Sequence, residues 1–303
     1  MKIPSVSYKN IKWISIKKPT KEHIEWLGQN FPFHPLDLED SLSRVQRPRI
    51  DSYASYVSLV LQFPSVEKGK FLASELNAFI GPNYLVTLHN ERLDIVDNLF
   101  RKCLKSKRET AYYLKLGPGR LLYTIVDKLV DSCFPLLEQM GNAIEKIDSQ
   151  LFEASPKGIV EKISVIRRNA IIFQTMIKPQ ITIFADLERG GSKLLNHNLK
   201  NYWGNINDHL HKIWDRLEDY RELIEGLAAT NESLLSFKTN EIIKILTIFS
   251  VVLLPLTLLS GIYGMNLSYL PFARHPAALA IITGIMLSVV ALMLLFFKKK
   301  RWV

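Results

Sequence analysis

The side chains of this chain that could do chemistry are uncharged amide and hydroxyl groups, and they lie in a long apolar segment. A long uncharged run ends at Gly264, Met265 and Asn266. A charged residue would be enough to end a membrane-spanning segment, so these three residues call for another explanation. Upstream of them, residues recur at alternating steps of three and four, which is one helix face with the coiled-coil period. The members of this 240–261 stripe are Asn240, Ile243, Thr247, Ser250, Leu254, Thr257 and Gly261.

The composition of the 240–261 stripe favours a pore lining. Amide and hydroxyl groups are costly when they face lipid, and small residues let helices approach a shared axis. The alternative is that the hydroxyl groups only bond carbonyls of their own helix, as Ser and Thr often do in membrane spans. A helix that merely anchors a protein in lipid gains nothing from Thr247, Ser250 or Thr257.

Groupings typical of enzymes are missing from the sequence. His209 and His211 stand two positions apart and would point to different sides of a helix, which makes a poor metal pair. Cys103 and Cys133 show no CxxC or Cys/His spacing and are expected to be reduced structural thiols. The segment "GPGRLLYT" lacks the Lys-Ser/Thr of a phosphate-binding loop. We therefore expect no enzyme.

Two uncharged segments are long enough to cross a membrane. Ile245–Tyr263 and Ala277–Phe297 each match the roughly 20 helical residues that a hydrocarbon core about 30 Å thick requires. With 48% hydrophobic and 22% charged residues, the chain is too apolar for an ordinary soluble protein and too polar for a multi-span one. We predict a first span at 242–264, an extracytoplasmic loop at 265–276 and a second span at 277–297; the family resemblance given below implies that the first span lines a pore.

The flanking charges predict the orientation of this hairpin. The N-terminal stretch lacks the apolar region of a signal peptide, so the large N-terminal part should stay in the cytoplasm. A basic tail at 298–303 follows the second span, and positive residues favour the cytoplasmic side. Its cations are Lys298, Lys299, Lys300 and Arg301. We expect a multi-pass protein of the plasma (inner) membrane with both termini in the cytoplasm.

The net charge of +10 does not point to nucleic acid. The cations are dispersed along the chain, and the one dense run adjoins a membrane span, where anionic lipid or a pore mouth is the natural partner. Acidic residues between 208 and 225 alternate with Lys and Arg at helical spacing, which is typical of solvated ion pairs.

The part before the spans divides at 118. Residues 1–118 mix strand-like segments, at 53–64 and 77–89, with short helices, which indicates a cytoplasmic α/β domain. Residues 119–241 read as a helical bundle and stalk, because apolar residues keep three-or-four spacing with few breakers. The last helix is predicted from about Asn205 to Tyr263, roughly 88 Å at 1.5 Å per residue. A helix of that length should bundle with copies of itself.

Tyr263-Gly264-Met265-Asn266 resembles the signature of the CorA family of divalent-cation channels. The segments "HPLDLEDSLSRVQRPRIDSY", "YLVTLH", "LLYTIVDKLVDSCFPLLEQM" and "KTNEIIKILTIFSVVLLPLTLLSGIYGMN" also resemble family segments, in the expected order. The resemblance implies an α+β fold with an N-terminal α/β domain, a long helical stalk and two C-terminal transmembrane helices. It further implies a homopentamer whose first spans line a central pore inside a ring of second spans.

The resemblance also implies roles for individual residues. Gly264, Met265 and Asn266 would form the selectivity filter, in which five Asn266 carbonyl dipoles meet the water shell of Mg²⁺, an ion that dehydrates reluctantly. Ile243, Leu246 and Leu254 would be apolar constrictions that gate by excluding water, and Asn240 a polar ring at the cytoplasmic end. A membrane potential of 100 mV would drive a divalent ion inward with about 4.6 kcal/mol.

Two departures from the family pattern affect regulation and ion choice. Family members hold cytoplasmic Mg²⁺ with acidic residues near subunit interfaces, and one such Asp is matched here by Asn205, which leaves Asp208 as a substitute. The loop "LSYLPFARHP" contains Arg274 and His275 where many members have an acid, a trait shared with the zinc-transporting ZntB branch.

The sequence thus predicts a homopentameric Mg²⁺ channel in the bilayer, with Co²⁺ or Ni²⁺ as further cargo and Mg²⁺ as regulatory ligand. The first alternative is a zinc transporter of ZntB type. The second is a tail-anchored cytoplasmic sensor or adaptor, in which the hairpin only tethers the soluble part.

Overall fold

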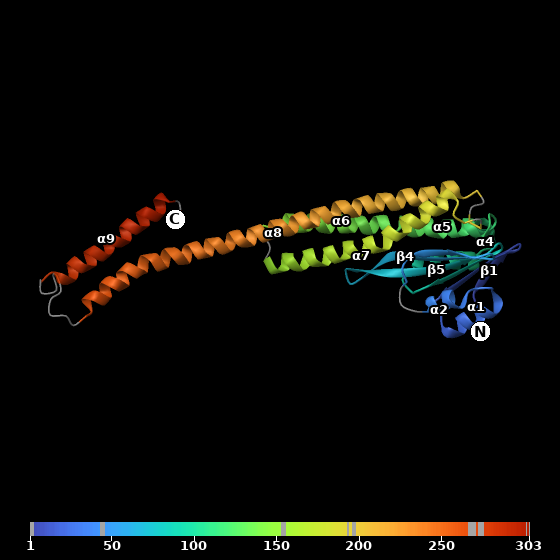
Figure 1. The fold of residues 1–303 in the computed structure, drawn as a ribbon, viewed down its shortest axis with the longest axis horizontal. Coiled ribbons are helices and arrows are strands. Elements are labelled where there is room, and N and C mark those ends of the chain that lie inside the picture. Colours follow the sequence, from blue (N-terminus) through green and yellow to red (C-terminus); the bar gives the residue numbers. More distant parts are fainter. Residues whose placement is uncertain are drawn as a thin grey trace. The chain divides into compact units, whose positions relative to one another are not determined.

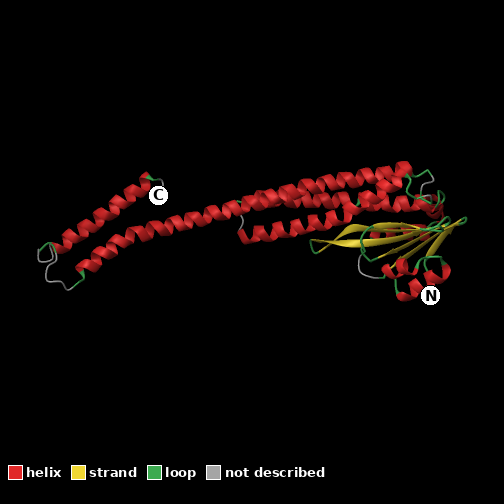
Figure 2. Cartoon of the chain, in the orientation of Figure 1, coloured by secondary structure: helices red, strands yellow, loops and turns green. Residues whose placement is uncertain are grey.

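The computed structural model describes residues 3–42, 46–152, 156–192, 194–195, 198–265, 271, 276–300 and 302 of the 303-residue chain. It divides into two compact units, Met1–Ala228 and Ala229–Val303. The first unit holds a β-sheet with helices, and the second contains helices and no described strand (Figure 2).

A six-stranded sheet forms the centre of the first unit, in the order β1-β2-β6-β5-β4-β3. Neighbouring strands are antiparallel except for β2 and β6, which are parallel with Trp13 opposite Leu85. The turn at Gly81 separates β5 from β6, as the Gly-Pro pair in the sequence predicts. The strands are β1 (Ser5–Tyr8), β2 (Ile11–Lys17), β3 (Arg49–Ser52), β4 (Val57–Glu67), β5 (Lys70–Ile80) and β6 (Tyr84–His89).

Both faces of the sheet are covered by helices (Figure 1). Helices α1 (Lys21–Asn30) and α2 (Pro35–Asp40) pack with Ile14 and Val86 on one face. On the other face Trp13 makes an edge-on contact with Phe100, with 4.9 Å between ring centroids. Because successive residues of a strand point to opposite faces, Trp13 and Ile14 can both be fully buried only in a sheet covered twice.

The second face carries the helical half of the unit. Helices α3 (Asp94–Lys105) and α4 (Lys107–Leu114) lead to Gly117, whose φ of 97° is a conformation that favours glycine. Helices α5 (Pro118–Asp131) and α6 (Cys133–Gln150) follow, separated only at Ser132, and α7 (Pro156–Arg189) packs on β4 and β5.

Helix α8 (Lys200–Tyr263) is continuous through Gly226 and Pro255, as predicted, but begins five residues before the predicted start at Asn205. The cause of the earlier start is tertiary packing. Trp203 is fully buried and its indole N–H donates to the Leu195 carbonyl at 3.1 Å. Helix α8 contains 64 residues, or about 96 Å at 1.5 Å per residue.

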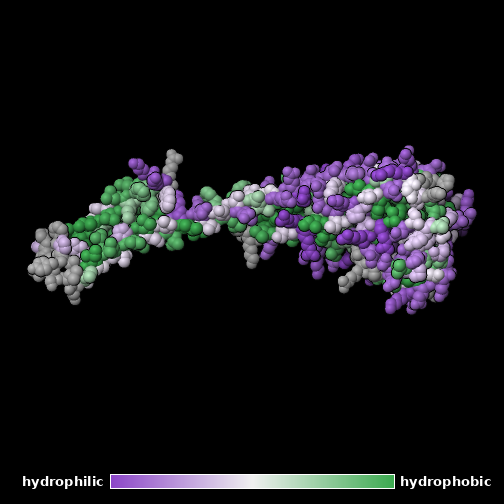
Figure 3. Space-filling view, viewed as in Figure 1, coloured by the Kyte–Doolittle hydropathy of each residue, from purple (hydrophilic) through white to green (hydrophobic). Residues whose placement is uncertain are grey.

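The second unit consists of the rest of α8 and of α9 (Ala278–Lys299). Both helices contain apolar windows long enough to cross a membrane, and neither window is buried within the chain. Hydrophobic side chains gather over these helices in Figure 3, as expected for surfaces that face lipid or other copies. The predicted spans 242–264 and 277–297 fall on α8 and α9.

Candidate functional site

The 240–261 stripe lies on one side of α8. At 3.6 residues per turn its seven members fall within a sector of about 100°, with the drift of roughly 20° per heptad expected for a 3.5-residue period on a straight helix. Within the chain, the side chains of Asn240, Ser250 and Thr257 are exposed, and Leu254 keeps 68% of its surface.

The opposite side of α8 is the one that the chain itself partly shields. Val252, Leu256, Leu259 and Tyr263 are half-buried, and at about 100° per residue they centre roughly 180° from Ser250 and Gly261. Helix α9 is the other described helix of this unit, and its half-buried residues also share one face, which includes Met286. Apart from Thr247, which is half-buried, the 240–261 stripe is therefore on the side of α8 left open for other partners.

A shallow groove of about 700 Å³ follows the outer half of the stripe. Its lining is mostly apolar but includes the two hydroxyl groups and the glycine of this segment. The lining residues are Ser250, Leu253, Leu254, Thr257, Leu258, Gly261, Ile262 and Met265. A Cβ added at Gly261 would have no atom within 4 Å, so this position is open space within the single chain.

The two threonine hydroxyl groups of the stripe bond to their own helix. Thr247 Oγ1 donates to the Ile243 carbonyl at 2.7 Å, and Thr257 Oγ1 donates to the Leu253 carbonyl at 2.9 Å. This is the local bonding that the sequence left open as the alternative to a pore lining. It does not decide between the two interpretations, because each hydroxyl oxygen keeps its lone pairs.

The predicted filter is described only in part. Gly264 N–H donates to the Ser260 carbonyl at 2.9 Å, and Met265, 53% exposed, ends the groove. A Cβ on Gly264 would lie 3.1 Å from the Ser260 carbonyl oxygen, so little space exists there for a side chain. Asn266 lies outside the described residues, as do Arg274, His275 and Arg301.

A group of potential metal ligands, which the sequence analysis missed, lies between α5 and α8. Asp127, Asp131 and His209 place one ligand atom each within 4.8 Å of one another. His209 Nδ1 is 3.6 Å from Asp131 Oδ1 and has no hydrogen-bond partner among the described residues. Carboxylate oxygen with imidazole nitrogen is a donor set that suits first-row divalent ions. We call these three residues the 127/131/209 cluster.

Asn205 adjoins the 127/131/209 cluster, whereas Asp208 does not belong to it. The Tyr123 hydroxyl donates to Asp127 Oδ1 at 3.1 Å, and Asn205 Nδ2 approaches the same oxygen at 3.5 Å. Asp208 is exposed. The signal that could have revealed the cluster is the four-residue spacing of Asp127 and Asp131, matched by that of Asn205 and His209, on two helices that pack together.

A second histidine is buried at the end of β6. His89 Nδ1 lies 2.8 Å from the Asn90 carbonyl, which makes it the protonated nitrogen, and Nε2 faces Asp97 Oδ1 at 3.5 Å. Lys17 forms an ion pair with the same carboxylate. Burial lowers the pKa of His89 despite the nearby Asp97.

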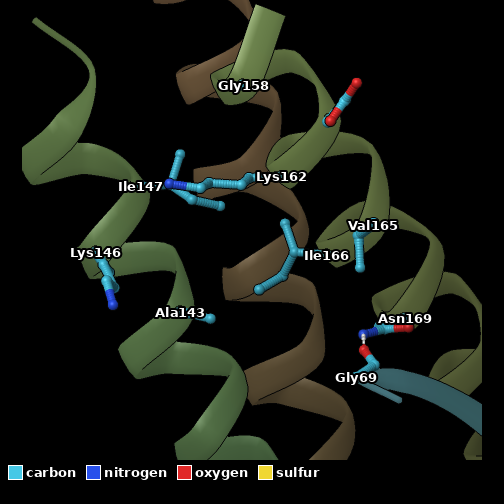
Figure 4. A pocket seen from close by; sticks show the side chains of 10 residues that line it. Gly69, Ala143, Lys146, Ile147, Gly158, Lys162, Val165, Ile166 and Asn169 are labelled. Carbon is cyan, nitrogen blue, oxygen red and sulfur yellow. Dashed lines mark hydrogen bonds between the residues drawn. The ribbon is translucent and has the colours of Figure 1, made fainter. Parts of the chain in front are cut away.

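A cavity of about 580 Å³ lies between α6, α7 and the β4–β5 turn (Figure 4). Asn169 closes one end of it. Its amide donates to the Gly69 carbonyl and accepts from the Phe71 N–H, both at 3.0 Å. The floor is apolar, with Ile147 and Ile166 facing each other across it. This cavity contains none of the predicted site residues.

The fold combines a large α/β unit with two helices that are long and apolar enough to cross a membrane, and the first of them has a face of small and polar residues. A sequence model of the family described as CorA-like Mg²⁺ transporter protein matches residues 8–299. The cobalt/magnesium transport protein CorA of Thermotoga maritima is 31% identical over 292 residues, which are 96% of this chain and 83% of that protein. The chain belongs to the CorA family of Mg²⁺ transporters.

Solved structures show the same fold. The CorA magnesium transporter of Methanocaldococcus jannaschii superposes with a TM-score of 0.86 at 22% identity, covering 98% of this chain and 94% of that one. A zinc transport protein, ZntB of Yersinia pestis, is more distant, at 21% identity over 96% of this chain and 87% of its own. Transport of divalent cations across a membrane is therefore the activity of the chain, which is not an enzyme.

Proposed function

We propose that five copies of the chain form a Mg²⁺ channel through which the membrane potential drives ions inward, with Co²⁺ and Ni²⁺ as further cargo. The observation that carries the proposal is the 240–261 stripe. Its polar and small residues, Thr247 excepted, are exposed within the chain, and burying such a side against other copies removes it from lipid.

In the proposed pore, rings of like residues succeed one another along α8. Asn240 forms the cytoplasmic polar ring, Ile243, Leu246 and Leu254 form apolar constrictions, and Gly264, Met265 and Asn266 form the filter. Amide carbonyls suit this place because a neutral dipole holds a hydrated Mg²⁺ weakly enough to release it. A thin ring of apolar side chains blocks ions when water leaves it.

In the proposed topology the protein lies in the plasma membrane, and both of its termini are in the cytoplasm. Residues 1–118 and 119–241 are then cytoplasmic, 242–264 and 277–297 cross the bilayer, and 265–276 face outward. Support comes from the run of cations that begins at Lys298 in the last turn of α9.

We further propose that cytoplasmic divalent ions, Mg²⁺ foremost, regulate the channel through the 127/131/209 cluster. Asp208, the substitute suggested by the sequence, is the competing location. His209→Gln and Asp131→Asn should raise the Mg²⁺ concentration that closes the channel, measured as the half-inhibitory concentration on the cytoplasmic side. A shift with Asp208→Asn alone would assign regulation to Asp208 instead.

Flux in liposomes that contain the purified protein tests the main proposal. Uptake of Mg²⁺, Co²⁺ and Zn²⁺ is compared at several membrane voltages. We expect Mg²⁺ uptake that rises with inward-negative voltage and is lost in Asn266→Ala. Particle mass in detergent should equal five chains, and a stable monomer would remove the pore.

Two other functions have specific outcomes in the same assay. The ZntB likeness and the non-acidic outer loop favour a zinc transporter as second candidate, which would show Zn²⁺ flux following a pH gradient without Mg²⁺ flux. A tail-anchored sensor would show no flux of any ion.

A further inference from the structure

The aromatic residues at the end of α9 make contacts that set this end apart from the rest of the helix. Phe297 keeps only 6% of its surface exposed and is the one buried residue in the described part of α9. Trp302 stacks on it, with 5.9 Å between the ring centroids and 17° between the ring planes. Phe296 contacts Phe297 edge-on and stays exposed. The second predicted span therefore ends in packed aromatic rings.

The backbone holds Trp302 against α9. The Trp302 N–H donates to the Phe297 carbonyl at 2.9 Å, and the Lys300 N–H donates to the Phe296 carbonyl at 3.0 Å. A bond to the carbonyl five positions earlier, accompanied by contact between the same two side chains, is typical of a helix C-cap of the Schellman type. This cap brings the indole beside the last turn of α9 instead of beyond it.

Three cations accompany the stacked rings. Lys298 and Lys299 lie in the last turn of α9 and Lys300 at its C-cap, and all three side chains are exposed. No Asp or Glu follows Glu241 in the sequence, so this segment has no acid of its own to neutralise them. A lysine stem can lie along an apolar surface while its ammonium group stays in water. Aromatic rings beside such ammonium groups match the boundary between acyl chains and headgroups.

We infer that Trp302, Phe297 and the cations Lys298–Lys300 form a binding site for an anionic phospholipid; this inference rests on the proposed course of α9 across the bilayer. The rings contact the upper part of an acyl chain, and the ammonium groups contact the phosphate and the acidic headgroup. Anionic lipid is preferred over zwitterionic lipid because a zwitterionic headgroup carries a cation of its own, which the lysines repel. A lipid held in this way fixes the depth at which α9 ends, since interfacial Trp and Lys anchors set how a span lies in the bilayer.

Tryptophan fluorescence of the full-length protein in liposomes tests the inference. Trp302 is the only one of the five tryptophans near a predicted span. The other four belong to the unit Met1–Ala228 and are Trp13, Trp26, Trp203 and Trp214. Phosphatidylglycerol or phosphatidylcholine with brominated acyl chains quenches an indole that touches it. The two lipids are exchanged at constant total composition, which gives the relative association constant, and Trp302→Phe supplies the background.

We expect brominated phosphatidylglycerol to be the stronger quencher of the wild type. The double substitution Lys299→Gln/Lys300→Gln should lower the association constant of phosphatidylglycerol relative to phosphatidylcholine at least about fivefold, the effect of one Lys near an anionic surface. Quenching by phosphatidylcholine should persist in it. The matched control is Lys105→Gln/Lys107→Gln, which neutralises two exposed lysines at the junction of α3 and α4 and should match the wild type.

Three results would overturn the inference. The first is equal quenching of the wild type by the two lipids, and the second is a preference for phosphatidylglycerol that survives the double substitution. The third is the same quenching in Trp302→Phe as in the wild type, which would place the indole away from lipid. None of these readouts requires ion passage. A protein with the lipid preference but without Mg²⁺ flux would contradict the proposed channel and leave this inference standing.

Discussion

Replacing Gly261 by alanine should make the chain more stable and the channel less conductive. Glycine inside a helix is destabilising relative to alanine, because it loses more backbone freedom on folding. The added Cβ would meet no atom within 4 Å of the single chain, so no steric cost opposes this gain. In a pore, however, the same methyl groups lie around a shared axis.

The magnitudes follow from these two environments. Each chain should gain about 0.5–1 kcal/mol from helix propensity. In the proposed pentameric pore, five methyl groups would enter the groove that Thr257 and Met265 also line. They would narrow the passage, and an ion that keeps its water shell needs the widest passage. We expect Mg²⁺ uptake to fall at least tenfold, with Gly261→Val below Gly261→Ala.

Gly284 on α9 provides the matched control. A Cβ there also meets no atom within 4 Å, so Gly284→Ala should bring a similar propensity gain. Thermal unfolding of the full chain in detergent measures the stability, and Mg²⁺ uptake in liposomes measures the flux. Wild-type flux in Gly261→Ala would place this side of α8 against lipid and refute the assignment of the stripe to a pore.

Three further predictions concern the unit Met1–Ala228. Burial lowers the pKa of His89, so the unfolded chain binds a proton at a higher pH than the folded chain does. The free energy of unfolding should therefore fall as the pH drops below about 6.5 and level off below the pKa of the folded state. Denaturant titrations of His89→Gln at several pH values should lack this dependence on pH. Asn169→Ala removes both hydrogen bonds to the β4–β5 turn and should cost about 1–3 kcal/mol in the same titration, whereas an unchanged midpoint would mean that water replaces them. Burial raises the pKa of Cys103 to about 11 and that of Cys133 further, so iodoacetamide at neutral pH should label both thiols only after denaturation, as counted by mass spectrometry.

Features that depend on local periodicity could be predicted from the sequence. The 240–261 stripe, the two spans and the unbroken course of α8 to Tyr263 all follow from spacing within one helix. The start of α8 could not be predicted in this way. Gly204 looks like a helix breaker in sequence, but it lies inside α8, where a Cβ would come within 2.9 Å of Glu188 Oε1. A side chain at this position would only displace the carboxylate of Glu188 on α7, so the glycine does not mark a turn.

Contacts between segments that are far apart in the chain could not be predicted from the sequence. The parallel pairing of β2 with β6 places Trp13 opposite Leu85, and no pattern within either segment indicates the other. The 127/131/209 cluster was missed for the same reason, since His209 was judged beside His211 on its own helix while its neighbours come from α5. The role of Asn266 stays a prediction, because that residue lies outside the described part of the chain.

The parallel pairing has a consequence for how the protein is made. Lys17 is opposite His89, so 72 residues (89 minus 17) separate the end of β2 from the end of its partner. A ribosome adding about 5–20 residues per second needs roughly 4–14 s to deliver β6. Throughout that interval the nascent β2 has an open edge and apolar side chains on both faces, which is the kind of surface that aggregates or recruits chaperones. All six strands leave the ribosome long before the apolar segments of α8 and α9, which enter the bilayer.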